Sequence, residues 1–279
     1  MISVIIPALN EEEGIADVLQ HLKIVLAQLC SEQYEIIVVD DGSTDNTSQV
    51  AEQNGVKVIK HPINIGYGNA LKSGILHAQY DAICITDADG TYPIDEIPKL
   101  WEMYQKGFDM VVGARTGAHY RESVLKNPAR IVFNWLAEYV AGRHIPDINS
   151  GLRIFKRDNV IPFLNDLCGT FSFTTSMTLI FFRQSFFVTY MPISYHARKG
   201  QSKVKIVRDT LRSGQILIQT ILTYNPLKLF LLISSIYNIL GVLFLMTYFL
   251  LNYRWEWFIA SLFMFLLSGL STLIGCLSF

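Results

Sequence analysis

The residues with the clearest chemical potential are two aspartates one residue apart, Asp87 and Asp89. They directly follow a short apolar run at 82–86, and ligands of open α/β sheets bind beyond the carboxyl ends of the strands. Two such carboxylates can share Mg²⁺ or Mn²⁺, which would neutralise a diphosphate while keeping several waters. Aspartate pairs are also common in ordinary turns. The preceding strand and the following Gly90 favour a metal site.

A second acidic pair, Asp40 and Asp41, follows the apolar run 35–39 in the same way. Because parallel strands end at the same edge of a sheet, we expect both pairs to converge there. One of the two acids could bind a base or a ribose. The alternative is a strand-to-helix turn in which Ser43 or Thr44 caps the next helix, and both interpretations can hold together.

A third polar loop follows the run 2–6 and contains Pro7, Asn10 and Glu11. Three polar loops at one sheet edge predict a nucleotide pocket. The pair Gly66 and Gly68 does not extend to a dinucleotide fingerprint, because Leu71 occupies the third glycine position. These glycines predict a tight turn, near the donor or purely structural.

The elements that must position these loops are strands and helices in βαβ order. The apolar runs are rich in β-branched residues and lack polar alternation, as expected for strands buried on both faces. We therefore predict an α/β fold with a mostly parallel sheet. The expected elements are strands at 2–6, 35–39, 56–60, 82–86 and 109–113, helices at 12–29, 44–53, 69–78, 95–106 and 129–141, and a polar loop at 114–127.

The end of the chain predicts a membrane anchor. Two uncharged runs, 229–251 and 257–279, are each long enough to cross a hydrocarbon core of about 30 Å. The segment 203–227 is amphipathic and could lie on the bilayer surface, or could pack on the soluble domain as an ordinary helix. We expect a domain at 1–202, this juxtamembrane segment, and two spans within 228–279.

Charge distribution predicts the orientation of this anchor. Six basic residues accompany only one acid before the first span, whereas the turn between the spans carries one of each sign. The positive-inside rule then places the catalytic domain on the cytoplasmic side of a multi-pass membrane protein. A net charge of −1 excludes a generally basic nucleic-acid binder. The four cysteines form no CxxC pair, and the first residues lack the features of a signal peptide.

Three motifs resemble family 2 glycosyltransferases of the GT-A fold: VIIPALNEE at 4–12, VVDDGSTD at 38–45 and DADG at 87–90. Two more, SGLRIFKR at 150–157 and RKGQSK at 198–203, together with the helical hairpin, resemble the polyprenyl-phosphate glycosyltransferase branch, which contains dolichyl-phosphate mannose synthase. The resemblance covers about residues 1–205. It implies a Rossmann-like GT-A domain followed by an amphipathic juxtamembrane helix and a two-helix transmembrane hairpin.

The resemblance also implies roles for individual residues. The nucleoside would be held by Pro7, Asn10, Glu11 and Asp40; the metal by Asp87 and Asp89; and phosphates by Arg115, Arg130, Arg198 and Lys203. Further substrate-binding candidates in the same motifs are Ala8, Asp41, Ala88, Ser150 and Ser202. One departure is Thr91, which stands where mannose synthases have a metal-binding Gln. This leaves the third metal ligand open and favours a UDP-sugar over GDP-mannose.

The implied reaction is transfer of a sugar, with inversion, from a nucleotide-sugar to polyprenyl or dolichyl monophosphate. A phosphate monoester with a second pKa of about 6 is largely dianionic at neutral pH, so this acceptor needs no strong base. Arg115 and Arg130 are the candidates for the acceptor phosphate, and Arg198 and Lys203 for closure over the donor diphosphate.

Other interpretations remain. Transfer to a sugar hydroxyl would require a base, for which Asp147 is available. A noncatalytic membrane scaffold that only binds a sugar nucleotide is the third. The expected partners are the donor, the lipid acceptor and the bilayer, and a homo-oligomer formed through the transmembrane helices is a further candidate.

Overall fold

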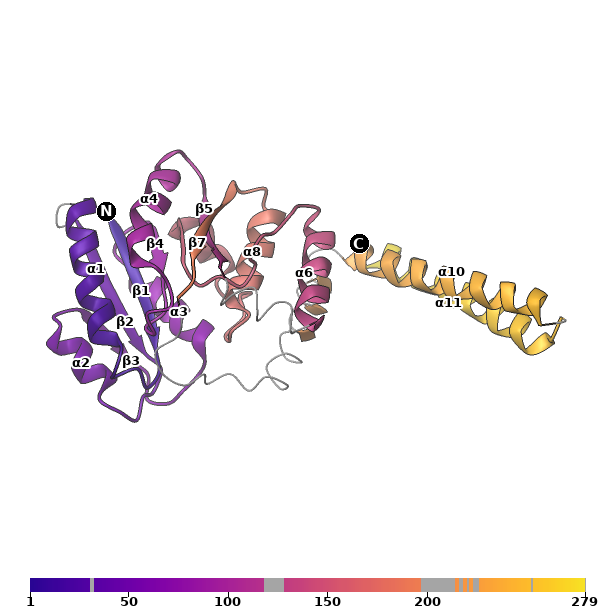
Figure 1. The fold of residues 1–279 in the computed structure, drawn as a ribbon, viewed down its shortest axis with the longest axis horizontal. Helices are drawn as coiled ribbons and strands as arrows, with labels where there is room; N and C mark the ends of the chain where they lie inside the picture. The colour runs from indigo at the N-terminus through magenta and orange to yellow at the C-terminus, as the bar shows by residue number, and fades with distance from the viewer. Residues whose placement is uncertain are drawn as a thin grey trace. The chain divides into compact units, whose positions relative to one another are not determined.

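The computed structural model describes residues 1–30, 33–117, 128–196, 214–215, 218–219, 221–222, 226–251 and 253–278. The chain forms two compact units, Met1–Leu217 and Ile218–Phe279. The first unit holds a β-sheet with helices packed against it, and the second holds a pair of long helices (Figure 1).

The sheet of the first unit has seven strands in the order β3-β2-β1-β4-β6-β5-β7. Strand β6 is antiparallel to both of its neighbours, and the other pairs are parallel. The predicted α/β fold with a mostly parallel sheet is therefore confirmed. The strands are β1 (Ile2–Ala8), β2 (Tyr34–Asp40), β3 (Lys57–Lys60), β4 (Ala82–Ile85), β5 (Met110–Thr116), β6 (Arg153–Lys156) and β7 (Val188–Ser194).

Helices pack on the sheet because its central strands are apolar on both faces. All seven residues of β1 and all four of β4 are buried. One core cluster joins residues of β1 such as Val4 and Ile6 to α1 and α4, while Ile5 lies against Gly74 of α3. The helices of this unit are α1 (Ile15–Cys30), α2 (Thr47–Gln53), α3 (Tyr67–His77), α4 (Ile97–Gln105), α6 (Pro128–Ala141), α7 (Arg157–Val160) and α8 (Phe173–Arg183), with 3₁₀ turns at Ile94–Glu96 and Ile161–Phe163.

The strand register brings the predicted polar loops to one edge. Ala8 pairs with Asp40, and the backbone N–H of Asp41 donates to the carbonyl of Ala8 at 2.9 Å. Beside them, Ile5 pairs with Ile85, and Thr86 N–H donates to the Ile5 carbonyl at 3.2 Å. The loops that follow these three strands therefore begin at the same edge of the sheet, as the sequence predicts.

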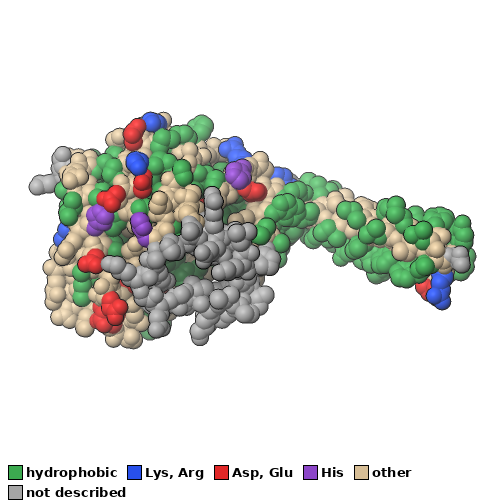
Figure 2. Space-filling view, in the orientation of Figure 1, with side chains coloured by type: hydrophobic (Ala, Val, Ile, Leu, Met, Phe, Trp, Pro, Cys, Tyr) green, Lys and Arg blue, Asp and Glu red, His purple; other side chains and the backbone are tan. Residues whose placement is uncertain are grey.

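The second unit consists of α10 (Pro226–Leu250) and α11 (Trp255–Leu277). With mean hydropathies of 2.3 and 2.0, both are long and apolar enough to cross a membrane. Figure 2 shows hydrophobic side chains over much of their surface. Small polar residues lie between them: Ser234 and Ser268 are joined by a 2.8 Å hydrogen bond, and Thr272 donates to Ser234 at 2.9 Å. Most of the expected juxtamembrane segment lies outside the described residues.

Candidate functional site

The loops after β1 and β2 are locked together by hydrogen bonds. Asn10, in a left-handed conformation with φ 50°, donates its N–H to Ser43 Oγ at 2.9 Å. Its own side-chain oxygen accepts the Thr44 N–H at 2.7 Å. Glu11 N–H donates to Thr47 Oγ1 at 2.8 Å. Two of the predicted nucleotide-binding loops therefore form one continuous polar rim.

Asp40 is buried at the end of β2, and it organises the turn that follows. One of its oxygens accepts the Ser43 N–H at 2.8 Å, and the other accepts the Ser48 hydroxyl. The predicted capping of the next helix by Ser43 or Thr44 is wrong, because α2 begins only at Thr47. The bonds of Ser43 to Asp40 and Asn10 keep the chain in a turn for three more residues.

Asp41 connects this rim to the start of α3. It is buried, and its carboxylate accepts the N–H groups of Ile65 at 3.1 Å and Gly66 at 2.8 Å. It also bonds to His61 Nδ1 at 2.7 Å, while His61 Nε2 bonds to Ser73 Oγ at 2.9 Å. Since these partners surround it, Asp41 fixes the loop rather than offering an open carboxylate.

Asp87 lies next to an aromatic residue that sequence patterns did not select. The Tyr67 hydroxyl donates to Asp87 Oδ1 at 3.1 Å. Burial raises the pKa of Tyr67 well above its usual range, and the nearby Asp87 charge raises it further. Tyr67 therefore keeps its proton at neutral pH and acts as the donor to Asp87. The two glycines beside Tyr67 are required for different reasons. Gly66 adopts a φ of 108°, which side chains rarely allow, and Gly68 lets the backbone approach the Cys168 carbonyl, which a Cβ would overlap.

Asp89 is held by the residue that departs from the mannose-synthase motif. Its Oδ1 accepts the Thr91 N–H at 3.1 Å and the Thr91 hydroxyl at 2.6 Å. Among the described residues, no group of three His, Cys, Asp or Glu side chains forms a metal cluster. Two carboxylates nevertheless fit Mg²⁺ or Mn²⁺ when substrate phosphates and water complete the shell. Thr91 orients one of these carboxylates.

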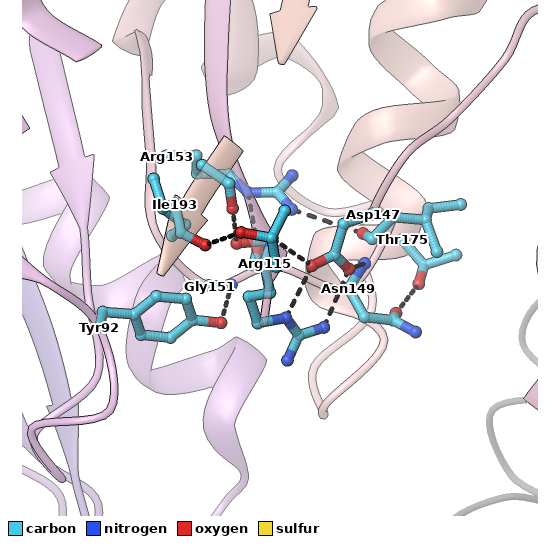
Figure 3. Close-up of polar contacts among 12 residues, drawn as sticks. Tyr92, Arg115, Asp147, Asn149, Gly151, Arg153, Thr175 and Ile193 are labelled. Carbon is cyan, nitrogen blue, oxygen red and sulfur yellow. Dashed lines mark hydrogen bonds and ion pairs between the residues drawn. The ribbon is translucent and has the colours of Figure 1, made fainter. Parts of the chain in front are cut away.

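An ion pair between Arg115 and Asp147 forms the second polar centre (Figure 3). Arg115 at the end of β5 donates through Nε to Asp147 Oδ2 at 2.7 Å and through Nη2 to Oδ1 at 2.9 Å. The Asp147 side chain is 2% exposed and that of Arg115 is 15% exposed. The guanidinium also lies over the Tyr195 ring, 5.4 Å from its centroid. Because Arg115 occupies both carboxylate oxygens of Asp147, this geometry suits orientation of Arg115.

Residues just after Asp147 connect the Arg115–Asp147 pair to the segment that follows the Asp87–Asp89 loop (Figure 3). Ser150 Oγ donates to the Gly113 carbonyl at 2.5 Å, and Gly151 N–H donates to the Tyr92 hydroxyl oxygen at 2.6 Å. The fully buried Arg153 donates to the Ser150 carbonyl at 2.5 Å. Burial lowers the pKa of Arg153. This buried cation braces the loop that carries Asp147.

The structure therefore brings together most of the predicted site residues. Pro7 and Ala8 end β1 and Asp40 ends β2, while Asn10, Glu11, Asp41, Ala88 and the metal candidates lie in the loops that follow the strands at the same sheet edge. Arg115, Asp147 and Ser150 form the Arg115–Asp147 centre. Arg130 lies in α6, but its side chain is not described. Arg198, Ser202 and Lys203 lie outside the described residues. Sequence reasoning missed Tyr67, Tyr92, Arg153 and Tyr195. Tyr67 had a signal in its place between two glycines, and Arg153 had one in its place within the motif at 150–157.

A mostly parallel sheet with acidic loops at its carboxyl edge defines a GT-A-like glycosyltransferase domain. The model of the family described as glycosyl transferase family 2 matches residues 3–174, and the chain belongs to this family. A crystal structure of glucosyl-3-phosphoglycerate synthase from Mycobacterium tuberculosis, in complex with Mn²⁺, UDP and glucosyl-3-phosphoglycerate, has the same fold. It superposes with a TM-score of 0.64 at 20% identity, over 79% of each chain.

Curated relatives narrow the comparison. The undecaprenyl-phosphate 4-deoxy-4-formamido-L-arabinose transferase of Klebsiella pneumoniae (strain 342) is 30% identical over 251 residues, which is 87% of this chain and 74% of the relative. The low-salt glycan biosynthesis hexosyltransferase Agl6 of Haloferax volcanii is 31% identical over 222 residues, or 78% of this chain and 53% of that protein. The predicted family and fold class are confirmed. The two apolar helices and these relatives support a membrane protein.

Proposed function

We propose that this family 2 glycosyltransferase transfers a sugar, with inversion, from a nucleotide-sugar to a polyprenyl monophosphate at the cytoplasmic membrane face. The observation that carries the choice of acceptor is an apolar helix that comes shortly before Asp147 in the chain. Helix α6 is followed within a few residues by Asp147, and Ile131, Val132 and Trp135 on it are 51%, 61% and 49% exposed.

The exposed face of α6 suits a lipid rather than water. Its buried residues Ala137 and Val140 lie on the opposite side of the helix from Trp135. A helix on the surface of a soluble protein carries polar residues on its outer face. Tryptophan beside aliphatic residues is instead typical of a helix lying in the membrane interface. Docked in this way, α6 would keep Arg115 close to the headgroup region, where a lipid phosphate resides.

The donor would bind along the rim of polar loops. Asn10, Glu11 and Asp40, with Pro7 and Ala8, would surround the nucleoside, and Asp41 would fix the loop beside them. Ala88 would lie next to Asp87 and Asp89 at the diphosphate. These two carboxylates would hold Mg²⁺ or Mn²⁺, which when bound stabilises the departing diphosphate. Mn²⁺ and UDP in the crystallised fold relative support this arrangement. Thr91 in place of a Gln favours a UDP-sugar over GDP-mannose.

The acceptor side would work through positioning rather than deprotonation. A dianionic lipid phosphate is already a nucleophile, and Asp147, with both oxygens bound by Arg115, supports a mechanism without a carboxylate base. Arg115 and Arg130 would align this phosphate with the anomeric carbon. Ser150 would hold the loop behind Arg115, and Arg198, Ser202 and Lys203 would complete the diphosphate site.

A transfer assay tests the proposal. Radiolabelled UDP- and GDP-sugars are incubated with the full-length protein and polyprenyl phosphate, with Mn²⁺ or with a chelator. We expect a lipid-linked product with one donor, lost on chelation. Products formed only with hydroxyl acceptors would contradict the proposed acceptor, and no product with any donor would favour a binding scaffold.

A thermal-shift measurement tests the metal role of Asp89 separately from sugar transfer. Binding of the active donor with Mn²⁺ should raise the melting temperature of the wild type. Asp89→Ala should abolish this metal-dependent shift, whereas Asp95→Ala, an exposed acid outside the loops, should retain it. If Asp89→Ala kept both the shift and transfer, the metal role of this carboxylate would be excluded.

A further inference from the structure

The first helix of the hairpin exposes an amide at its centre. Asn238 stands at the middle of the 25-residue helix α10, and its side chain is exposed. Three other polar residues of the helix have partners: Ser234 bonds to Ser268, Ser235 donates to the Leu231 carbonyl, and Thr247 donates to the Phe244 carbonyl. Within the described part of the chain, Asn238 has no hydrogen bond. Polar groups in the hydrocarbon core are strongly disfavoured unless they are hydrogen-bonded.

Asn238 belongs to a regular exposed row. Leu231, Ser235, Asn238 and Val242 follow one another at intervals of four, three and four residues, and all are exposed. Leu245 and Phe249 continue the same spacing. This is the 3.5-residue repeat with which two helices pack in a left-handed pair. We call this row the Asn238 seam.

Helix α11 does not cover the Asn238 seam. It packs instead on residues of α10 such as Ser234 and Gly241, where the Gly241 position lies against the Phe265 ring. Helix α11 therefore packs along the Ser234 and Gly241 side of α10. The Asn238 seam stays exposed and is available to a helix of another molecule. A single polar residue within such a repeat fixes register between helices, at a cost in stability.

We propose that the Asn238 seam is the contact through which two copies of this chain associate in the membrane. Identical chains insert with the same topology, so their α10 helices run parallel. A two-fold axis along the membrane normal then places every seam residue opposite its own copy. An amide both donates and accepts, and two asparagines at the same depth therefore satisfy each other. An apolar partner or lipid offers Asn238 nothing equivalent.

Disulfide cross-linking in liposomes tests this geometry. Cysteine replaces either Val242, in the seam, or the adjacent Leu243, which is exposed on a different side of the helix. Purified full-length protein is reconstituted at a low protein-to-lipid ratio and oxidised, and the unmodified chain provides the blank for native cysteines. We expect a dimer from Val242→Cys that persists on dilution with lipid, and little from Leu243→Cys. Equal cross-linking at both positions, or none at Val242→Cys, would overturn the proposal.

The role of the amide is tested in the Val242→Cys background. Asn238→Val should weaken dimerisation about three- to thirty-fold, the range found for such interhelical bonds, while Asn238→Gln should largely retain it. Ile239→Val, an exposed position beside the seam about 100° round the helix from Asn238, is the matched control and should change nothing. Donor binding by each variant verifies folding. Undiminished cross-linking in Asn238→Val would show that this amide does not hold the interface.

Discussion

The hydroxyl of Tyr67 donates a hydrogen bond to Oδ1 of Asp87 at 3.1 Å. Tyr67 begins α3, and its ring stacks on Phe171 with centroids 5.7 Å apart. The position of one candidate metal ligand thus depends on a helix that lies outside the acidic motif. Partners of this kind fix the orientation of a metal-binding carboxylate.

Tyr67→Phe should weaken metal binding while leaving the fold intact. Loss of the hydroxyl frees Asp87 to rotate, and removal of such a supporting bond typically costs 10- to 100-fold in metal affinity. Mn²⁺ binding can be followed by electron paramagnetic resonance with donor nucleotide present. Tyr104→Phe is the control, since Tyr104 is half-buried in α4 and its hydroxyl has no hydrogen bond among the described residues. Unchanged Mn²⁺ affinity in Tyr67→Phe would exclude a supporting role.

The sequence was sufficient to predict the sheet edge because local patterns carry that information. Buried parallel strands are continuous apolar runs, and Asp40 and Asp87 each follow one directly. The parallel pairing of β1 with β2 and β4 agrees with the βαβ order. Helix boundaries were less accurate: α2 begins at Thr47 rather than 44, because side-chain bonds to Ser43 extend the turn.

The second polar centre was less predictable because it depends on long-range packing. Strand β6 has four residues and inserts antiparallel between β4 and β5, a placement that no local periodicity reveals. Arg153 lies in the motif at 150–157 and is fully buried, with donors satisfied by the backbone carbonyls of 148, 150 and 174. Tyr92 bonds to Gly151 across 59 residues. Such contacts exist only once the sheet has formed.

Asp147→Asn should act through Arg115 rather than by removing a base. Loss of one partner from a mostly buried pair costs about 3–5 kcal/mol in the free energy of unfolding, measurable by denaturant titration in detergent. Asp158→Asn, an exposed control, should change it by less than about 0.5 kcal/mol. KM for the lipid phosphate should rise, and the pH–rate profile should keep its shape. Disappearance of an acidic limb from that profile would instead identify Asp147 as the base.

Asp109 should make the fold sensitive to acid. Burial raises its pKa, but the hydrogen bonds from Lys156, Phe187 and Asn159 outweigh burial and hold the pKa below the ordinary value. A carboxyl with a depressed folded-state pKa contributes stability above its unfolded pKa of about 4, and this stability is lost as pH falls through the folded-state value.

Asp109→Asn removes that titration. At neutral pH it should lower the free energy of unfolding by about 1.5–3 kcal/mol, the contribution of hydrogen bonds to a charged group. Below pH of about 4, the difference between the variant and the wild type should shrink. Denaturant midpoints measured across this pH range provide the comparison, with Asp158→Asn again as control. A difference that stayed constant with pH would contradict the depressed pKa of Asp109.

The exposed face of α6 should matter only when the acceptor is in a membrane. Replacing both Ile131 and Val132 by Ser removes apolar area from that face, and a loss of about 1.4 kcal/mol in interfacial binding corresponds to a ten-fold higher KM. We expect this increase for long-chain polyprenyl phosphate in vesicles, with the donor KM unchanged. A short, water-soluble prenyl phosphate should show no increase. Ile24→Ser is the matched control, because Ile24 is 60% exposed on α1. An equal increase in KM for both acceptors would contradict a role of α6 in membrane docking.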